Sequence, residues 1–405
     1  YVILSIMSDK EACNILWMDE VNIFDKNIVG GKNASLGEMY QNLTSKGIKI
    51  PFGFMVTSSA YKKFIRHNNL ESKISEQLKN INYDDTVSLK RVGMNIRTEI
   101  QNGIFPDDFN KEVSEYYEEL SKKYQDNDGN PQLYTDVAVR SSGTAEDLPD
   151  ASFAGQQETY LNVRTVKELL FSIKKCFSSL YTDRAISYRK SRKLFSNIKL
   201  SVAVQKMVRS DLGSAGVAFS IDSETGFDKV ILINGAFGLG ELVVSGKIKP
   251  DEILVFKDKV DGVHKPIIER KIGQKNIKMV YGTNPDEKVE IIGLDKSYQN
   301  KMCINSEKIL QLSKWVIELE KYYSKLYNKW CPLDIEWAID GLSNELYLVQ
   351  ARPETVYSRK NRDIIHEYHM KANNNKVLLE GVAVGNKIST GRVKKMWNID
   401  SRDSV

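Results

Sequence analysis

Residues 333–352 have the sequence LDIEWAIDGLSNELYLVQAR, which predicts two antiparallel strands joined by a tight turn. Apolar and polar side chains alternate in the first run, 333–339, and the second run, 345–350, is equally rich in strand-forming residues. The residues between them, 340–344, include Asp, Gly, Ser and Asn, which favour turns. The stretch therefore predicts a β-hairpin.

One face of this hairpin is expected to carry polar side chains. Asp334 and Glu336 project to the same face because successive side chains of a strand alternate. If the turn centres on Ser343, antiparallel pairing places Glu336 opposite Gln350 and Asp334 opposite Arg352. The hairpin therefore predicts two acids, an amide and a guanidinium on a single surface.

Two of these side chains suit a magnesium ion. Mg²⁺ prefers a few oxygen ligands from the protein together with substrate phosphates, and Glu336 and Gln350 offer such oxygens. Arg352 would neutralise phosphate charge. The alternative is an exposed, salt-bridged hairpin face, which is common in proteins. The glutamine beside the acid favours a metal–nucleotide site over that alternative.

A strand followed by a polar loop gives a second candidate phosphate site. Residues 136–140 predict a short strand that ends in Arg140, and residues 141–157 follow as a loop with hydroxyls and glycine. Backbone N–H groups and hydroxyls of such a loop can surround a polyphosphate while a guanidinium binds its oxygens. An ordinary surface loop is an equally good interpretation. The loop residues concerned are Ser142, Gly143 and Thr144.

A glycine-rich turn is expected before a helix near the N-terminus. Residues 28–33 read IVGGKN, and the apolar residues of 34–47 then follow helical spacing. Lys32, beside the start of a helix, would suit a phosphate. The spacing of a Walker A motif is missing. For this segment alone, an ordinary helix-entry turn is therefore the stronger interpretation.

Residues 201–208 predict a strand whose end could face a flat base. Its last residues include Gln205, Met207 and Val208, and an edge strand can present backbone groups and apolar side chains to an aromatic ring. Such a strand more often belongs to the core. Residues 238–240, Gly-Leu-Gly, match part of a dinucleotide fingerprint, but the third glycine is missing and a Rossmann site is not favoured.

The remaining elements indicate a mixed α+β or α/β chain. Further helices are expected at 165–193 and 305–327, and further strands at 50–57, 215–221, 229–234 and 252–256. Residues 358–376 are basic and polar and predict a linker. The glycines and valines after residue 377 indicate the first strands of another domain.

Composition narrows the class of protein. The chain has 405 residues with 58 Lys and Arg against 53 Asp and Glu, and a length of this order predicts two or three domains. The net charge of +5 is spread along the sequence, so no nucleic-acid partner is expected. The four cysteines are widely spaced, and no apolar run is long enough to cross a bilayer. We therefore expect a cytoplasmic protein with no membrane partner.

Four segments together resemble the phosphoenolpyruvate synthase (pyruvate, water dikinase) family. They are residues 29–39 (VGGKNASLGEM), 139–163 (VRSSGTAEDLPDASFAGQQETYLNV), 271–281 (KIGQKNIKMVY) and 334–356 (DIEWAIDGLSNELYLVQARPETV). They occur in the family's order from about residue 15 onward, and the second and fourth are long and specific.

The resemblance implies an ATP-grasp nucleotide-binding domain of two subdomains, residues 1–195 and 196–357. A linker, 358–376, would lead to the incomplete start of a swivelling phosphohistidine domain, 377–405. The family converts ATP, pyruvate and water to AMP, phosphoenolpyruvate and phosphate through a phosphorylated histidine. The resemblance also implies ATP as substrate, Mg²⁺ as cofactor and the phosphohistidine domain as partner. A homodimer is possible.

The resemblance also assigns roles to matching residues. Lys32, Arg140 and Arg352 would be catalytic cations that bind phosphate, and Glu336 and Gln350 would be ligands of Mg²⁺. The remaining ATP-binding positions would be the phosphate loop Ser142, Gly143 and Thr144, the adenine-side strand residues Gln205, Met207 and Val208, and the acid Asp334.

The sequence departs from the family in two places. The phosphohistidine motif GGxTSHAA is absent from residues 1–405, and so is the pyruvate-binding barrel, so we expect the chain as given to be incomplete for the full reaction. Residues 324–331 resemble a short insertion beside the metal-binding strand. The alternatives are a rifampin-type antibiotic phosphotransferase and a non-catalytic nucleotide-binding partner.

Overall fold

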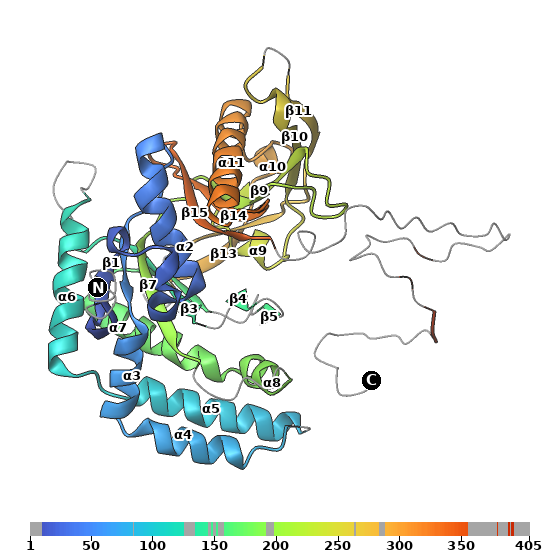
Figure 1. The fold of residues 1–405 in the computed structure, drawn as a ribbon. Helices are drawn as coiled ribbons and strands as arrows, with labels where there is room; N and C mark the ends of the chain where they lie inside the picture. The colour runs from blue at the N-terminus through green and yellow to red at the C-terminus, as the bar shows by residue number, and fades with distance from the viewer. Residues whose placement is uncertain are drawn as a thin grey trace. The chain divides into compact units, whose positions relative to one another are not determined.

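The computed structural model describes residues 10–83, 85–124, 134–144, 147–148, 151–152, 158–191, 198–262, 265–282 and 288–354, with a few isolated positions after 378. Residues 1–359 form one compact unit and residues 360–405 a second. The predicted linker and the predicted start of a swivelling domain fall almost wholly outside the described residues. In the first unit, two antiparallel sheets are accompanied by helices (Figure 1).

The first sheet has the strand order β1-β2-β7-β3-β6. Its long central strands, β7 and β3, are each buried at six of seven positions. Both faces of these two strands are therefore covered. The strands are β1 (Ile15–Trp17), β2 (Gly53–Val56), β7 (Leu200–Lys206), β3 (Val137–Gly143) and β6 (Thr159–Val163).

Among the described residues, the helices of this half of the unit include α3 (Ser58–His67), α4 (Leu70–Lys79), α5 (Thr86–Asn102), α6 (Asp107–Lys122), α7 (Val166–Ser178) and α8 (Asp183–Ser191). Aromatic contacts join them, as between Phe64, Phe105 and Phe177. The single helix expected at 165–193 is wrong. A 3₁₀ turn, Ser179–Tyr181, divides it, and the Thr182 hydroxyl accepts a hydrogen bond from the Ala185 N–H at the start of α8.

The second sheet has the order β11-β10-β9-β8-β14-β15. The long helix α11 (Ser306–Leu326) packs on it with an apolar stripe buried, Ile309, Leu312, Val316 and Leu319. The Asn305 side chain caps its first turn. The strands are β11 (Ile267–Lys271), β10 (Asp251–Phe256), β9 (Val230–Phe237), β8 (Ser214–Phe219), β14 (Leu333–Ile339) and β15 (Leu346–Pro353).

The predicted hairpin register is confirmed. Glu336 pairs with Gln350, and Asp334 pairs with Arg352. A bulge follows, so that Trp337 pairs with Leu348, one position away from a continuous register. The ring of Trp337 is buried on the opposite face, toward the core.

The remaining elements are short. They are β4 (Asp147–Leu148), β5 (Ala151–Ser152), α9 (Glu241–Val244), α10 (Lys296–Gln299) and the hairpin of β12 (Ile277–Tyr281) and β13 (Val289–Gly293). Within the described ranges, no helix is long and apolar enough to cross a membrane.

Strand β7 connects to the second sheet through a short segment, because β7 ends at Lys206 and β8 begins at Ser214. We call residues 207–213 the hinge segment. Strand β7 lies between β2 and β3, so the first sheet includes a strand beyond residue 195. The division into subdomains at that residue stays a prediction.

Helix α2 (Lys26–Leu43) contacts strands of both sheets, β3 and β7 of the first and β15 of the second (Figure 1). The Asn33 amide donates to the Ser201 hydroxyl (3.0 Å), and the Ser35 hydroxyl donates to the Ala351 carbonyl (2.7 Å). The predicted turn before a helix is corrected in one respect. Helical residues lie on both sides of it, and the break is confined to Gly30, with φ 77° and ψ 165°.

We expect Gly30→Ala to destabilise the chain strongly. A Cβ atom there would lie 2.3 Å from the Ser142 hydroxyl oxygen, and the positive φ adds a cost. Gly47→Ala is the matched control, because Gly47 also has a positive φ but nothing within 4 Å of an added Cβ. The control should lose about 1–2 kcal/mol for the left-handed backbone, and Gly30→Ala about 1–3 kcal/mol more for overpacking. Equal losses in urea unfolding would contradict this.

Candidate functional site

The polar face of the β14–β15 hairpin carries the four side chains that the sequence grouped. The Arg352 guanidinium donates from Nε and Nη2 to one carboxylate oxygen of Asp334, at 2.8 and 2.6 Å. Burial raises the pKa of Asp334, the Arg352 charge opposes that shift, and nearby Glu336 adds to it. The face therefore holds an acid whose charge depends on a neighbouring cation.

Arg140 reaches this face from the other sheet. Its Nη2 donates to Glu336 Oε2 and to Gln350 Oε1, both at 2.8 Å, and its Nη1 donates to the Val349 carbonyl at 3.1 Å. The pairing within the hairpin could be predicted, but this contact joins residues 196 positions apart, between β3 and β14. One guanidinium thus joins the two sheets.

The break in α2 lies against the end of β3. An added Cβ at Gly30 would meet both the hydroxyl and the carbonyl of Ser142, so the two backbones approach closely. The Ser142 hydroxyl is buried and, among the described residues, has no hydrogen-bond partner. Lys32 follows two positions after Gly30 in the same helix and is partly exposed. The structure thus brings the glycine-rich segment and the phosphate-loop candidate together.

Thr144, the last residue of that loop candidate, is engaged elsewhere. Its backbone N–H donates to the Lys199 carbonyl at 3.0 Å, and its hydroxyl accepts from the Lys199 N–H at 3.2 Å. Gly143, next to it, is the last residue of β3. Residues 145–146, 149–150 and 153–157 of the predicted loop lie outside the described residues.

The three residues predicted to contact the adenine, on β7 and the hinge segment, differ in their surroundings. Gln205 is buried, and its amide donates to the Pro51 carbonyl at 3.0 Å. Met207 and Val208 line a cavity of about 900 Å³, together with Phe52 and Tyr347. The structure therefore places an apolar wall at the hinge segment, while Gln205 is held within the sheet.

A comparison of the sequence with models of protein families identifies the domain. Residues 26–373 match the model of the pyruvate phosphate dikinase AMP/ATP-binding domain. This range includes the second sheet, every strand of the first sheet except β1, helix α2, Arg140 and the β14–β15 hairpin. The chain belongs to this family.

Curated relatives extend the match. The chain is 50% identical to phosphoenolpyruvate synthase of Aquifex aeolicus over 401 residues, covering 98% of this chain and 46% of the relative. It is 45% identical to the synthase of Synechocystis (97% and 48%) and 46% identical to that of Helicobacter pylori (96% and 48%). The resemblance indicated by the four motifs is confirmed. The chain spans about half the length of the curated relatives it matches.

The oxygens of this AMP/ATP-binding domain fit a small hard cation. Glu336 Oε2 and Gln350 Oε1 both lie 2.8 Å from one nitrogen of Arg140, so they converge on a single positively charged point. Among the described residues, no group of three or more His, Cys, Asp or Glu could hold a metal. One carboxylate and one amide suit Mg²⁺, which takes its other ligands from water and phosphate.

Some residues around this domain's site were not predicted from the sequence. Asp136, Lys206, Arg209 and Tyr281 form a polar network beside the hinge segment. Tyr281 lies in the segment 271–281 that carried the family resemblance, but nothing in the spacing indicated its partner. Burial raises the pKa of Glu241, and Glu336 adds to the shift, so a further acid lies near the polar face.

The expected insertion, residues 324–331, leaves the domain's strand pairing intact. The Cys331 N–H donates to the Ser324 hydroxyl at 3.0 Å, and the Trp330 indole donates to Glu320 at 3.0 Å. The segment folds back on the end of α11, and β14 pairs with β15 from Leu333 onward.

Proposed function

We propose that the face between the two sheets binds Mg·ATP, and that the chain is the nucleotide-binding part of a phosphoenolpyruvate synthase. In this role it transfers a phosphoryl group from ATP to a histidine of a swivelling domain. The observation that carries the proposal is the convergence of Arg140, from one sheet, on Glu336 and Gln350 of the other. The family match and the names of the relatives support it.

Phosphoryl transfer depends mostly on positioning and on neutralising charge. When bound, Mg²⁺ would neutralise the charge of the phosphate oxygens, and Glu336 and Gln350 would hold it. Arg352 and Lys32 would bind phosphate oxygens, and Asp334 fixes the direction of Arg352 through its two hydrogen bonds. Ser142, Gly143 and Thr144 would line the phosphate site on the side of the first sheet.

Arg140 would change partners when the nucleotide binds. Its guanidinium holds the oxygens that the metal would need. An incoming triphosphate offers stronger, charge-assisted acceptors to the same guanidinium. We therefore assign Arg140 two roles, neutralising Glu336 before binding and neutralising phosphate afterwards.

The base would enter the cavity at the hinge segment. Met207 and Val208 give it an apolar wall, Phe52 and Tyr347 supply aromatic surface, and the volume of about 900 Å³ is ample for a purine ring. Tyr347 follows Leu346 at the start of β15, the strand that carries Gln350. The cavity and the polar face are therefore joined by one strand.

The rest of the reaction extends beyond this chain. Phosphoenolpyruvate as a product comes to the proposal from the relatives' name. Pyruvate and water as acceptors, AMP as a product and the partner histidine come from the family resemblance of the four motifs. A homodimer and a cytoplasmic location are proposed with them.

Calorimetric titration with ATP, with and without Mg²⁺, tests the proposal. We expect binding that Mg²⁺ strengthens, and Glu336→Gln should lower the Mg²⁺-dependent affinity at least about tenfold, or about 1.4 kcal/mol, because a charged ligand is lost. Glu345→Gln on the same hairpin is the control, since Glu345 is half-exposed and pairs with Lys49. An unfolding curve checks that each variant is folded. Failure of the wild-type chain to bind ATP would refute the proposal.

The double role of Arg140 predicts that its replacement strengthens metal binding and weakens nucleotide binding. In Arg140→Met without nucleotide, Mn²⁺ should bind more tightly than in the wild type, because no guanidinium competes for Glu336 and Gln350. ATP should bind more weakly. Electron paramagnetic resonance of free Mn²⁺ gives the first affinity and calorimetry the second.

Arg270→Met serves as the control for this experiment, because Arg270 lies on β11 and donates to the Ser306 hydroxyl, away from the polar face. Unchanged or weaker Mn²⁺ binding in Arg140→Met would show that Arg140 does not compete with the metal.

A further inference from the structure

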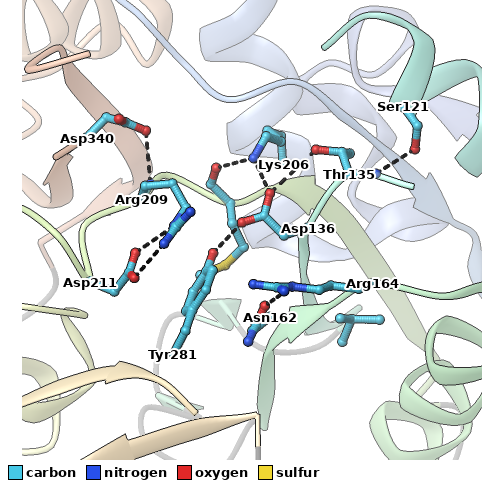
Figure 2. A network of polar contacts seen from close by, with 12 residues as sticks. Ser121, Thr135, Asp136, Asn162, Arg164, Lys206, Arg209, Asp211, Tyr281 and Asp340 are labelled. Carbon is cyan, nitrogen blue, oxygen red and sulfur yellow. Dashed lines mark hydrogen bonds and ion pairs between the residues drawn. The ribbon is translucent and has the colours of Figure 1, made fainter. Parts of the chain in front are cut away.

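A polar network surrounds the start of the hinge segment (Figure 2). Its centre is the Asp136 carboxylate, next to the start of β3. One oxygen accepts from the Lys206 ammonium and the other from the Tyr281 hydroxyl. The side chains of Asp136 and Lys206 are only 11% and 16% exposed. A carboxylate this enclosed is costly unless it is paired, and here it has a third donor as well, the Thr135 hydroxyl at 3.5 Å.

The network holds the backbone of Met207 from two directions. The Met207 N–H donates to the Asp136 carbonyl at 3.0 Å. The Met207 carbonyl accepts from the Lys206 ammonium, also at 3.0 Å. Both backbone groups of the first hinge residue are therefore fixed by residues whose side chains meet at the Asp136 carboxylate.

Tyr281 connects the network to the β12–β13 hairpin, which is a second link between the two halves of the unit. It ends β12, and the β12–β13 hairpin is anchored to the second half where the Leu239 N–H donates to the Met279 carbonyl at 2.9 Å. The hairpin also reaches the first half. The Lys288 ammonium donates to Glu168 at 2.7 Å, and the Asn162 amide donates to the Lys288 carbonyl at 2.9 Å. The hairpin thus spans the same junction as the hinge segment.

Two guanidinium groups lie against the Tyr281 ring, Arg209 at 4.5 Å and Arg164 at 5.3 Å from its centre. Arg209 belongs to the hinge segment, and both its Nε and its Nη2 donate to Asp211 at 2.9 Å. Its backbone N–H donates to Asp340 at 3.0 Å, at the turn of the β14–β15 hairpin. The network therefore extends from β3 through the hinge segment to the hairpin that carries the polar face.

The contacts of the network favour an ionised Asp136 and a protonated Tyr281. Burial by itself would raise the pKa of Asp136, but Lys206, Tyr281 and Arg209 outweigh it and the pKa is lowered. Burial and the Asp136 charge raise the pKa of Tyr281, which stays a hydrogen-bond donor.

We propose that Asp136, Lys206 and Tyr281 are positioning residues for nucleotide binding. We call the three the hinge latch. By fixing Met207 and pinning the β12–β13 hairpin to the first sheet, they set the base cavity at a fixed distance from the polar face on β14 and β15. This inference rests on the proposed function for what is bound, but the rigidity of the hinge segment can be measured without a ligand.

Asp136 and Lys206 also line the base cavity, whereas Tyr281 is absent from its lining, so the hydroxyl of Tyr281 acts through the hinge segment and not by contact with the nucleotide. A loosened hinge lets the base cavity and the phosphate-binding groups move apart, so that ordering them becomes part of the cost of binding. Loss of the latch should therefore weaken ATP binding while leaving Glu336, Gln350 and Arg140 in place.

Tyr281→Phe is the sharpest test, because it removes only a hydroxyl. We expect the ATP dissociation constant to rise about fivefold to tenfold. This is less than the full worth of a hydrogen bond to a charged acceptor, which is on the order of tenfold to hundredfold, because the bond lies within the protein and only part of its loss falls on binding. Hydrogen exchange of the Met207 amide, measured without nucleotide, should become faster than in the wild type. Tyr322→Phe is the matched control, because its hydroxyl also donates to a carboxylate, that of Glu38, away from the hinge segment.

Asp136→Asn is the second variant and should give a larger rise in the ATP dissociation constant, because the partner of Lys206 loses its charge. A melting curve identifies any variant that does not fold. Wild-type hydrogen exchange at Met207 and wild-type ATP affinity in Tyr281→Phe would overturn the latch. If the wild-type chain binds no ATP, the proposed function fails, and the Met207 exchange rate alone still decides whether the latch fixes the hinge.

Discussion

The Arg140 guanidinium is the interaction on which the site depends. It leaves the first sheet and meets a carboxylate, an amide oxygen and a backbone carbonyl of the second, at 2.8, 2.8 and 3.1 Å. A half-buried carboxylate such as Glu336 needs a cation, and a cation drawn from the opposite sheet also fixes how the sheets face each other. One side chain thus contributes both to the electrostatic balance of the polar face and to the geometry of the two halves.

Two further contacts between the halves support that geometry. Helix α2 bonds to β7 through Asn33 and to β15 through Ser35, and its break at Gly30 allows it to approach Ser142. The hinge latch also holds the chain between the sheets. Both contacts restrain the polar face, which is the preorganisation that electrostatic stabilisation of a transferring phosphoryl group requires.

The sequence allowed the hairpin register to be predicted, because a period of two and a turn of known chemistry determine which residues face each other. The bulge after Glu336 could not be predicted from this period, because a bulge interrupts it. The partner of Arg140 could not be predicted from spacing, since it lies on the other sheet. The same is true of Tyr281 and Asp136. The placement of β7 in the first sheet and the division of the helix at Ser179–Tyr181 also follow from tertiary packing.

A crystal structure of this chain with Mg²⁺ and a non-hydrolysable ATP analogue tests the central claim most directly. The account predicts that the Arg140 guanidinium lies on phosphate oxygens, that Glu336 and Gln350 bind the metal, and that the base occupies the cavity beside Met207 and Val208. An analogue bound elsewhere, or one bound while Arg140 still bridges Glu336 and Gln350, would contradict it.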